Sequence, residues 1–254
     1  MTRAVLLDLD DTLVVEEAAA VAAFAATAAV AAERHPIDAA ALAIDARVRA
    51  RELWRAAPAH PYCRRIGVSS WEGLWCRFEG EDGDLPALRR WAPDYRRETW
   101  RLALAGQGVE DAALAEELGE RFGVERRALH ETFPDAAPAL DALAGRYPLA
   151  LVTNGASCLQ REKLAASGLG GRFAVVVAGG DVGAAKPDRA IFERALAAVG
   201  VAPGEAVMAG NSLQNDVEGA IALGMGAIWV DRDGAPARPG VTTVRDLRDL
   251  PALL

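Results

Sequence analysis

Three acidic residues follow an apolar run near the amino terminus, in the sequence D-L-D-D-T at residues 8–12. The run before them, residues 4–7, predicts a strand that is buried on both faces. In an extended segment the side chains of Asp8 and Asp10 point to the same side. Two carboxylates about 4 Å apart repel by about 4 kcal/mol at an effective dielectric constant near 20, so the pair implies a cation or a shared proton.

Three later strand ends also carry polar groups. The sequence T-N-G at 153–155 presents a hydroxyl and backbone N–H groups that suit an anion. Lys186 precedes a proline that suits the first turn of a helix, and G-N-S-L-Q-N-D at 210–216 offers oxygen ligands of the kind that Mg²⁺ takes. Each pattern alone is also a common turn or surface charge. In a parallel sheet, however, the carboxyl ends of the strands meet at one edge, where ligands bind.

The ordered set of motifs resembles the haloacid dehalogenase superfamily. The motifs that carry the resemblance are D-L-D-D-T (8–12), T-N-G (153–155), K-P (186–187) and G-N-S-L-Q-N-D (210–216). A longer pattern over residues 153–164, T-N-G-x-x-x-x-Q-x-x-K-L, looks like the branch that contains pyrimidine nucleotidases and N-acylneuraminate phosphatases. The resemblance covers residues 1–15 and about 131–254.

The resemblance implies a catalytic role for each motif. It makes Asp8 the nucleophile that attacks phosphorus to form an aspartyl-phosphate, and Asp10 the group that protonates the leaving alcohol and then activates water. It implies that Thr153 and the amide of Asn154 bind phosphoryl oxygens, and that Lys186 neutralises the nucleophile and the phosphate. The cofactor that it implies is Mg²⁺, held by Asp8, the backbone carbonyl of Asp10, Asn211 and Asp216.

The fourth motif departs from the family pattern at one position. The first acid of that motif is usually Asp, and here it is Asn211. An amide oxygen can still bind Mg²⁺, but it brings no negative charge. We therefore expect either an active enzyme with a looser metal site or a protein that has lost activity.

Two kinds of element must position these residues. Residues 16–130 predict an all-helical insert without an internal strand, and the helices are expected near 17–33, 38–57, 69–79, 85–105 and 110–122. From residue 131 onward, strands expected at 149–152, 173–178, 206–209 and 227–230 alternate with helices expected at 134–144, 157–167, 190–199 and 216–223, and a short piece at 242–245 with a closing segment at 246–254 completes the fold. Residues 1–15 and 131–254 therefore predict a Rossmann-like α/β core, a parallel sheet with helices on both faces. The insert is similar to the C1 cap domain of the family.

Composition restricts the class of protein. The chain has 254 residues, 52% hydrophobic and 25% charged, as in a globular soluble protein. A net charge of −8 argues against a nucleic-acid polymer as partner. The uncharged stretch 18–32 is too short and too rich in Ala to span a membrane, and the amino terminus lacks a secretory signal. Three cysteines without metal-like spacing, Cys63, Cys76 and Cys158, predict free thiols in the cytoplasm.

The function that the residues and the resemblance favour is a Mg²⁺-dependent phosphatase acting on a small soluble phosphate monoester such as a nucleotide, a flavin phosphate or a sugar phosphate. A 2-haloacid dehalogenase, a sugar phosphomutase and a noncatalytic binding module remain alternatives on the same fold. Arg64 and Arg65 in the insert suit an anionic substrate, but they also suit a solvated basic patch. The sequence leaves the physiological substrate and the oligomeric state open.

Overall fold

The structure is a computed structural model that describes residues 1–236 and 238–254. The chain folds into two compact units. One consists of Met1–Val15, Arg65–Gly67 and Glu131–Leu254, and the other of Glu16–Arg64 and Val68–His130. We call them the sheet unit and the helical unit.

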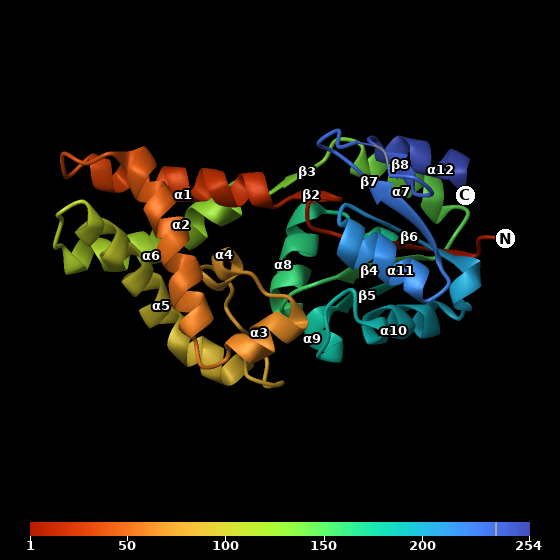
Figure 1. Cartoon of the computed structure of the whole chain (residues 1–254), viewed down its shortest axis with the longest axis horizontal. Coiled ribbons are helices and arrows are strands. Elements are labelled where there is room, and N and C mark those ends of the chain that lie inside the picture. The colour runs from red at the N-terminus through yellow and green to blue at the C-terminus, as the bar shows by residue number, and fades with distance from the viewer. Residues whose placement is uncertain (237) are drawn as a thin grey trace. The chain divides into compact units, whose positions relative to one another are not determined.

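A six-stranded parallel sheet organises the sheet unit (Figure 1). Its strand order is β5-β4-β1-β6-β7-β8, with the bounds β1 Ala4–Leu7, β4 Leu149–Thr153, β5 Val175–Ala178, β6 Ala206–Gly210, β7 Gly226–Val230 and β8 Thr242–Val244. The first strand is central, and Leu7 pairs with Leu151 on one side and with Ala209 on the other. The carboxyl ends of β1, β4 and β6 are therefore neighbours.

The two faces of the sheet are covered separately. Val5 and Leu7 of β1 join one apolar cluster, and Ala4 and Leu6 join the other. This alternation puts every side chain of β1 in a core, as its continuous apolar sequence predicts. The helices of the unit are α7 Ala136–Ala144, α8 Ser157–Ser167, α9 Gly179–Val182, α10 Arg189–Val199, α11 Gly219–Ala222 and α12 Leu250–Leu253. The predicted Rossmann-like fold is confirmed.

The helical unit packs around aromatic side chains. Its helices are α1 Glu17–Ala32, α2 Ala39–Ala56, α3 His60–Ile66, which ends in the sheet unit, α4 Ser70–Gly73, α5 Leu85–Gly106 and α6 Ala112–Ala128. The ring centroids of Phe24 and Phe122 lie 4.6 Å apart, and those of Trp91 and Tyr95 lie 4.7 Å apart and nearly parallel. Most of the aromatic residues of this segment thus serve as core.

Several predicted boundaries differ from the structure. The expected helix at 69–79 is only Ser70–Gly73, and a turn follows at residues 74–75. Gly73 lies against the Trp54 ring, where a Cβ would come within 2.3 Å. Helix α3 lies between the helices expected at 38–57 and 69–79, where no helix was predicted. Pro61 is tolerated there because a proline in the first turn of a helix costs no hydrogen bond. A two-residue antiparallel pair, β2 Val14–Val15 with β3 Glu131–Thr132, is too short to show a sequence period.

The segment Arg65–Gly67 lies in the sheet unit, although the predicted insert, 16–130, contains it. Two backbone hydrogen bonds of 2.7 Å account for this: Gly155 donates to the carbonyl of Ile66, and Ala185 donates to the carbonyl of Arg65. Residues 65–67 therefore pair with the loop that follows β4 and with the loop that precedes α10.

Candidate active site

The loop after β1 fixes the position of Asp8. Its backbone N–H donates to the Ala209 carbonyl at 3.0 Å, which continues the pairing of β1 with β6. The chain then turns sharply, because the Leu9 carbonyl accepts hydrogen bonds from Leu13 and Val14. The turn brings the Thr12 hydroxyl back to donate to Oδ2 of Asp8 at 2.9 Å. One carboxylate oxygen of Asp8 is thus held, and the other faces Lys186.

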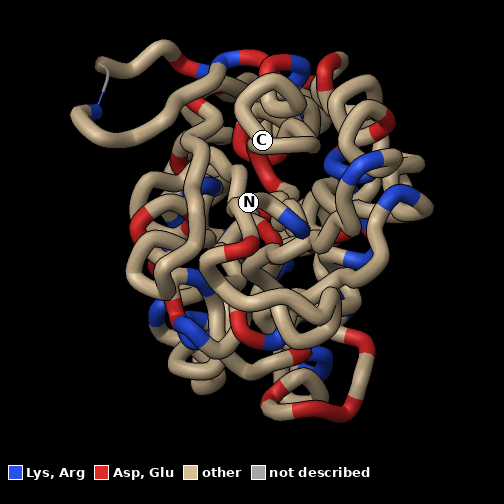
Figure 2. Tube along the Cα trace, turned by 90° about the vertical axis from the view of Figure 1, so that its right-hand side faces the viewer, with Lys and Arg blue, Asp and Glu red and all other residues tan. Residues whose placement is uncertain are grey.

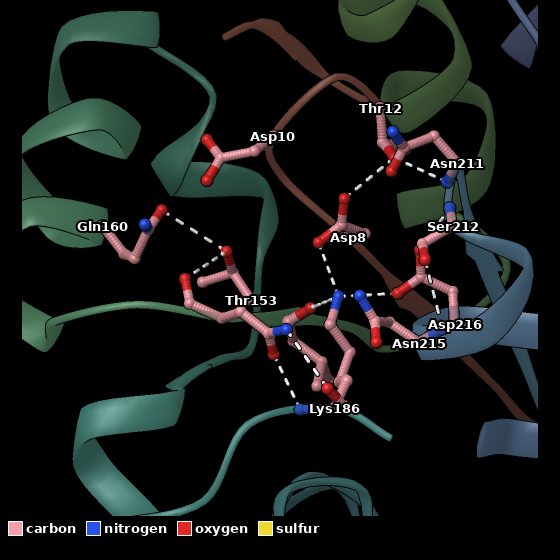
Figure 3. A network of polar contacts seen from close by, with 12 residues as sticks. Asp8, Asp10, Thr12, Thr153, Gln160, Lys186, Asn211, Ser212, Asn215 and Asp216 are labelled. Carbon is pink, nitrogen blue, oxygen red and sulfur yellow. Dashed lines mark hydrogen bonds and ion pairs between the residues drawn. The ribbon is translucent and has the colours of Figure 1, made fainter. Parts of the chain in front are cut away.

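Lys186 lies between two carboxylates (Figure 3). Its Nζ is 2.5 Å from Oδ1 of Asp8 and 2.7 Å from Oδ1 of Asp216, and it donates to the Val152 carbonyl at 2.7 Å. Burial alone lowers the pKa of this ammonium, but the charges of Asp216 and Asp8 outweigh that effect and the net pKa is raised. Lys186 is therefore a permanent cation beside Asp8.

Asp216 lies in a π-helical turn, which is wider than an α-helical one. The segment Leu213–Glu218 is π-helical, a geometry found often at functional sites, and Asp216 is 1% exposed within it. The Ser212 N–H donates to its Oδ2 at 2.9 Å. Burial raises the pKa of Asp216 to about 6, against the opposing charge of Lys186. A side chain at Gly210 would put its Cβ 2.3 Å from Oδ2 of Asp216, so only glycine fits there.

Asp10 lines the same pocket as Asp8. We expected the two side chains on the same side, and Figure 3 shows the carboxylate of Asp10 farther from Lys186, on the side where Gln160 lies. The turn of residues 11–13 begins only after Asp10. A different ammonium, Nζ of Lys163, is 3.0 Å from both oxygens of Asp10. The repulsion between the two carboxylates is thus relieved by two lysines, one for each.

The T-N-G sequence lies at the end of β4, as predicted. The Thr153 hydroxyl donates to Oε1 of Gln160 at 3.3 Å, and Gln160 is fully buried. The side chain of Asn154 accepts from the backbone N–H of Lys186 at 2.7 Å. This hydrogen bond ties the loop after β4 to the loop that carries Lys186.

These side chains surround one pocket of about 200 Å³. Its lining residues are Asp8, Asp10, Thr153, Asn154, Lys186, Asn211, Ser212, Asn215 and Asp216. Seven of the predicted site residues are therefore brought together. Arg64 and Arg65 are absent from this lining. Arg64 belongs to the helical unit, and Nε of Arg65 donates to the Gly183 carbonyl at 3.1 Å.

The pocket offers oxygen ligands suited to a hard cation. Asp8, Asn211 and Asp216 supply carboxylate and amide oxygens, and among the described residues the buried Oδ1 of Asp216 has only its ion pair with Lys186. Within the described residues there is no group of three or more His, Cys, Asp or Glu side chains placed to hold a metal ion. Residue 211 contributes an amide oxygen, so Asp8 and Asp216 are the carboxylates among these three oxygen donors. The donor set thus fits Mg²⁺ with reduced charge.

Comparison with known proteins bears on what this pocket does. A protein-family model described as haloacid dehalogenase-like hydrolase matches residues 2–224. The chain belongs to this family. The hydrolase is 42% identical to phosphoserine phosphatase of Thermus thermophilus over 80% of its own length and 82% of that protein. It is 32% identical to pyrimidine 5′-nucleotidase of Escherichia coli (55% and 68% covered) and to human N-acylneuraminate-9-phosphatase (63% and 68% covered).

Solved structures agree on the fold of this hydrolase. A HAD phosphatase from Thermococcus onnurineus superposes with a TM-score of 0.60 at 28% identity, covering 99% of this chain and 97% of that one. A 2-haloacid dehalogenase from Pseudomonas syringae superposes with a TM-score of 0.62 at 26% identity, covering 100% and 98%. The fold therefore places the hydrolase in the family without choosing between these two chemistries.

Four further residues of the site were given no role from the sequence. Ser212 and Asn215 line the pocket, and Gln160 and Lys163 contact Thr153 and Asp10. A signal for the last two was present: they are the Gln and Lys of the pattern over 153–164, three positions apart on one face of a predicted helix. Their target could not be read from the sequence, because it depends on where that helix packs.

Proposed function

We propose that this hydrolase is a Mg²⁺-dependent phosphatase that cleaves a small soluble phosphate monoester through an aspartyl-phosphate. The observation that carries the proposal is the 2.5 Å contact between Oδ1 of Asp8 and Nζ of Lys186 in a polar pocket of about 200 Å³. The names of the three relatives, all phosphatases or nucleotidases, support it.

Charge explains why the nucleophile needs its neighbours. A carboxylate that approaches a phosphate dianion faces two unit repulsions, on the order of 8 kcal/mol at 4 Å and an effective dielectric constant of 20. Lys186 supplies one positive charge at that position. Asp8, Asn211, Asp216 and the backbone carbonyl of Asp10 would hold Mg²⁺, which would supply two more positive charges against the negative charge of the phosphoryl oxygens.

The remaining groups divide the work of binding and proton transfer. The hydroxyl of Thr153 and the N–H of Asn154 bind the phosphoryl oxygens. Asp10 protonates the leaving alcohol, and in the second step the same carboxylate takes a proton from the water that attacks the aspartyl-phosphate. Each proton that Asp10 gives to the alcohol is thus regained from water within one turnover.

The helical unit is, in this proposal, a C1-type cap formed by residues 16–130 that closes over the pocket and selects the substrate. A nucleotide, a flavin phosphate or a sugar phosphate fits the proposal, and the Thermus relative adds phosphoserine to the panel. We place the enzyme in the cytoplasm. The thiols of Cys63, Cys76 and Cys158, which form no disulfide among the described residues, support that location.

A 2-haloacid dehalogenase is the second candidate, favoured by the Pseudomonas structure and by the Asn at 211. It would also use Asp8 as nucleophile, but dehalogenation has no leaving alcohol to protonate and so leaves Asp10 without a task. Release of phosphate from a panel of esters with Mg²⁺, measured beside release of chloride from 2-chloropropionate, separates the two functions.

The same panel tests Asp8. We expect Asp8→Asn to lose phosphate release by at least about 10³-fold, because an amide cannot attack phosphorus. Asp11→Asn is the matched control: it makes the same chemical change on the same loop, where the backbone has φ 56, a conformation that Asn accepts. Full activity of Asp8→Asn on any ester that the wild type cleaves excludes the proposal.

A further inference from the structure

A second buried lysine contacts Asp10, a residue of the pocket lining, from another element. Lys163 lies on α8, and its side chain is 0% exposed. Its Nζ is 3.0 Å from Oδ1 and 3.0 Å from Oδ2 of Asp10, whose side chain is 24% exposed at the pocket. Burial of an ammonium is unfavourable unless a charged partner compensates for the lost hydration, and Asp10 is such a partner.

The contact constrains direction as well as charge. A lysine equidistant from both oxygens holds the carboxylate group in one orientation, and charge-assisted hydrogen bonds are the stronger ones. The support is rigid, because α8 is a regular helix packed through Leu159 and Leu164. Two residues on one face of this helix contact the pocket lining: Gln160 contacts Thr153, and Lys163 contacts Asp10.

Asp8 and Asp10 each form an ion pair with a different lysine. Lys186 contacts Asp8 and Asp216, whereas Lys163 contacts Asp10. Figure 3 shows the carboxylate of Asp10 farther from Lys186 than that of Asp8, on the side where Gln160 lies. Attack on phosphorus and departure of the alcohol take place on opposite sides of the phosphoryl group, so a proton donor must lie apart from the nucleophile.

We propose that Lys163 is a positioning residue, which holds the carboxylate of Asp10 apart from Asp8 and directed at the leaving oxygen of the substrate. This inference rests on the proposed phosphatase function. Without Lys163, the carboxylate of Asp10 loses this constraint on its rotation, and the proton reaches the leaving oxygen less often. The attack by Asp8 is unaffected, because Lys186 contacts Asp8 independently.

The test compares two esters that differ in their need for a proton. Phenolate is a poor leaving group, since the pKa of phenol is about 10, as for a Tyr side chain, and its departure requires protonation. Dinitrophenolate leaves without a proton. We expect Lys163→Met to lower kcat/KM by about 10²-fold on phenyl phosphate, the usual size of a general-acid contribution. On 2,4-dinitrophenyl phosphate it should stay within about threefold of the wild type.

Two further variants separate positioning from folding. Lys163→Arg keeps a cation with hydrogen-bond donors and should restore part of the phenyl phosphate activity, whereas Lys163→Gln should not. Arg161→Met is the control on the same helix, because Arg161 is half exposed and pairs with Asp181. If Lys163→Met does not fold, as judged by thermal unfolding, the Arg and Gln variants carry the same comparison.

The outcomes are distinct. An equal loss on both esters, or no loss on phenyl phosphate, overturns the positioning role while leaving the phosphatase intact. A wild type that cleaves neither ester with Mg²⁺ overturns the proposed function itself.

Discussion

Asn211 lies in the lining of the pocket, where Asp would bring a negative charge. Its Oδ1 lies 3.3 Å from Oγ1 of Thr12, its N–H donates to the same Oγ1 at 3.0 Å, and its carbonyl accepts from the Trp229 indole at 2.8 Å. The residue is therefore positioned from both sides at the pocket wall. What it lacks, compared with Asp, is a negative charge facing the cation site.

Restoring that charge should tighten the metal site. We expect Asn211→Asp to bind Mg²⁺ about tenfold more tightly than the wild type, because carboxylate ligands set the affinity of such sites. Titration calorimetry and Mg²⁺-dependent activity measure the change. An unchanged affinity would show that residue 211 does not contact the metal.

Asp216 gives the metal-free protein a defined pH dependence. Because burial raises its pKa from 3.8 to about 6, the folded protein takes up this proton more readily than the unfolded chain. Its contribution to stability is therefore full below pH 4 and is lost as the pH rises through 6. The free energy of unfolding of the wild type minus that of Asp216→Asn should fall by on the order of 3 kcal/mol between those limits.

Denaturant unfolding in EDTA at several pH values measures this difference. Asn is neutral throughout, so the subtraction removes the carboxylates whose pKa is lowered elsewhere in the chain. A difference that stays flat or rises with pH would contradict the assigned environment of Asp216.

At the scale of elements, the close contact of β6 with the π-helical turn determines whether Asp216 reaches the pocket. Gly210→Ala should lower the free energy of unfolding by about 1–3 kcal/mol, the usual cost of overpacking, and should weaken Mg²⁺ binding because Asp216 must move. Gly204→Ala is the matched control, since its added Cβ would meet no atom closer than 3.9 Å. Equal effects of the two substitutions would show that Gly210 is not needed for the site.

The elements that carry the site could be predicted because their signals are local. A four-residue apolar run marks β1, and turn residues mark the ends of β4 and β6, so the meeting of Asp8, Thr153 and Asn211 follows from parallel pairing. The position of Asp216 depends in addition on the π-helical turn after β6. The ion pair between Asp10 and Lys163 could not be predicted, because it depends on where α8 packs in the folded protein.

At the scale of the whole molecule, an internal ion pair closes the helical unit. Arg126 of α6 pairs with Glu16, the first residue of the unit, and both side chains are buried. The Trp71 indole donates to Glu16 at 3.3 Å, and the guanidinium of Arg126 lies 5.0 Å from the Trp75 ring centroid. The beginning and the end of a segment of more than one hundred residues are thus joined by one buried contact.

Breaking this pair should destabilise the protein. We expect Glu16→Gln to lower the free energy of unfolding by about 3–5 kcal/mol, because it leaves the charge of Arg126 buried without its partner. The exposed neighbour Glu17→Gln should stay within about 0.5 kcal/mol. Chemical denaturation measures both. Equal stability of the two variants would show that the ion pair does not hold the unit together.

The charge of the molecule is distributed rather than concentrated. Figure 2 shows Lys and Arg interspersed with Asp and Glu along the trace. The net charge of −8 is the difference between 28 basic and 36 acidic residues. Among residues 1–236 and 238–254, each helix is too short or too polar to cross a membrane. Three buried charged residues, Asp8, Lys186 and Asp216, line the pocket.

Covalent capture of phosphorus by Asp8 is the claim on which the mechanism depends. The direct measurement mixes the enzyme with Mg²⁺ and 2,4-dinitrophenyl phosphate, quenches in acid within milliseconds, and maps peptides by mass spectrometry. We predict one added phosphoryl group on the peptide that contains residue 8, and none in Asp8→Asn. Turnover of the ester by an enzyme that carries no phosphoryl group at Asp8 at any quench time, or carries it elsewhere, would contradict the account.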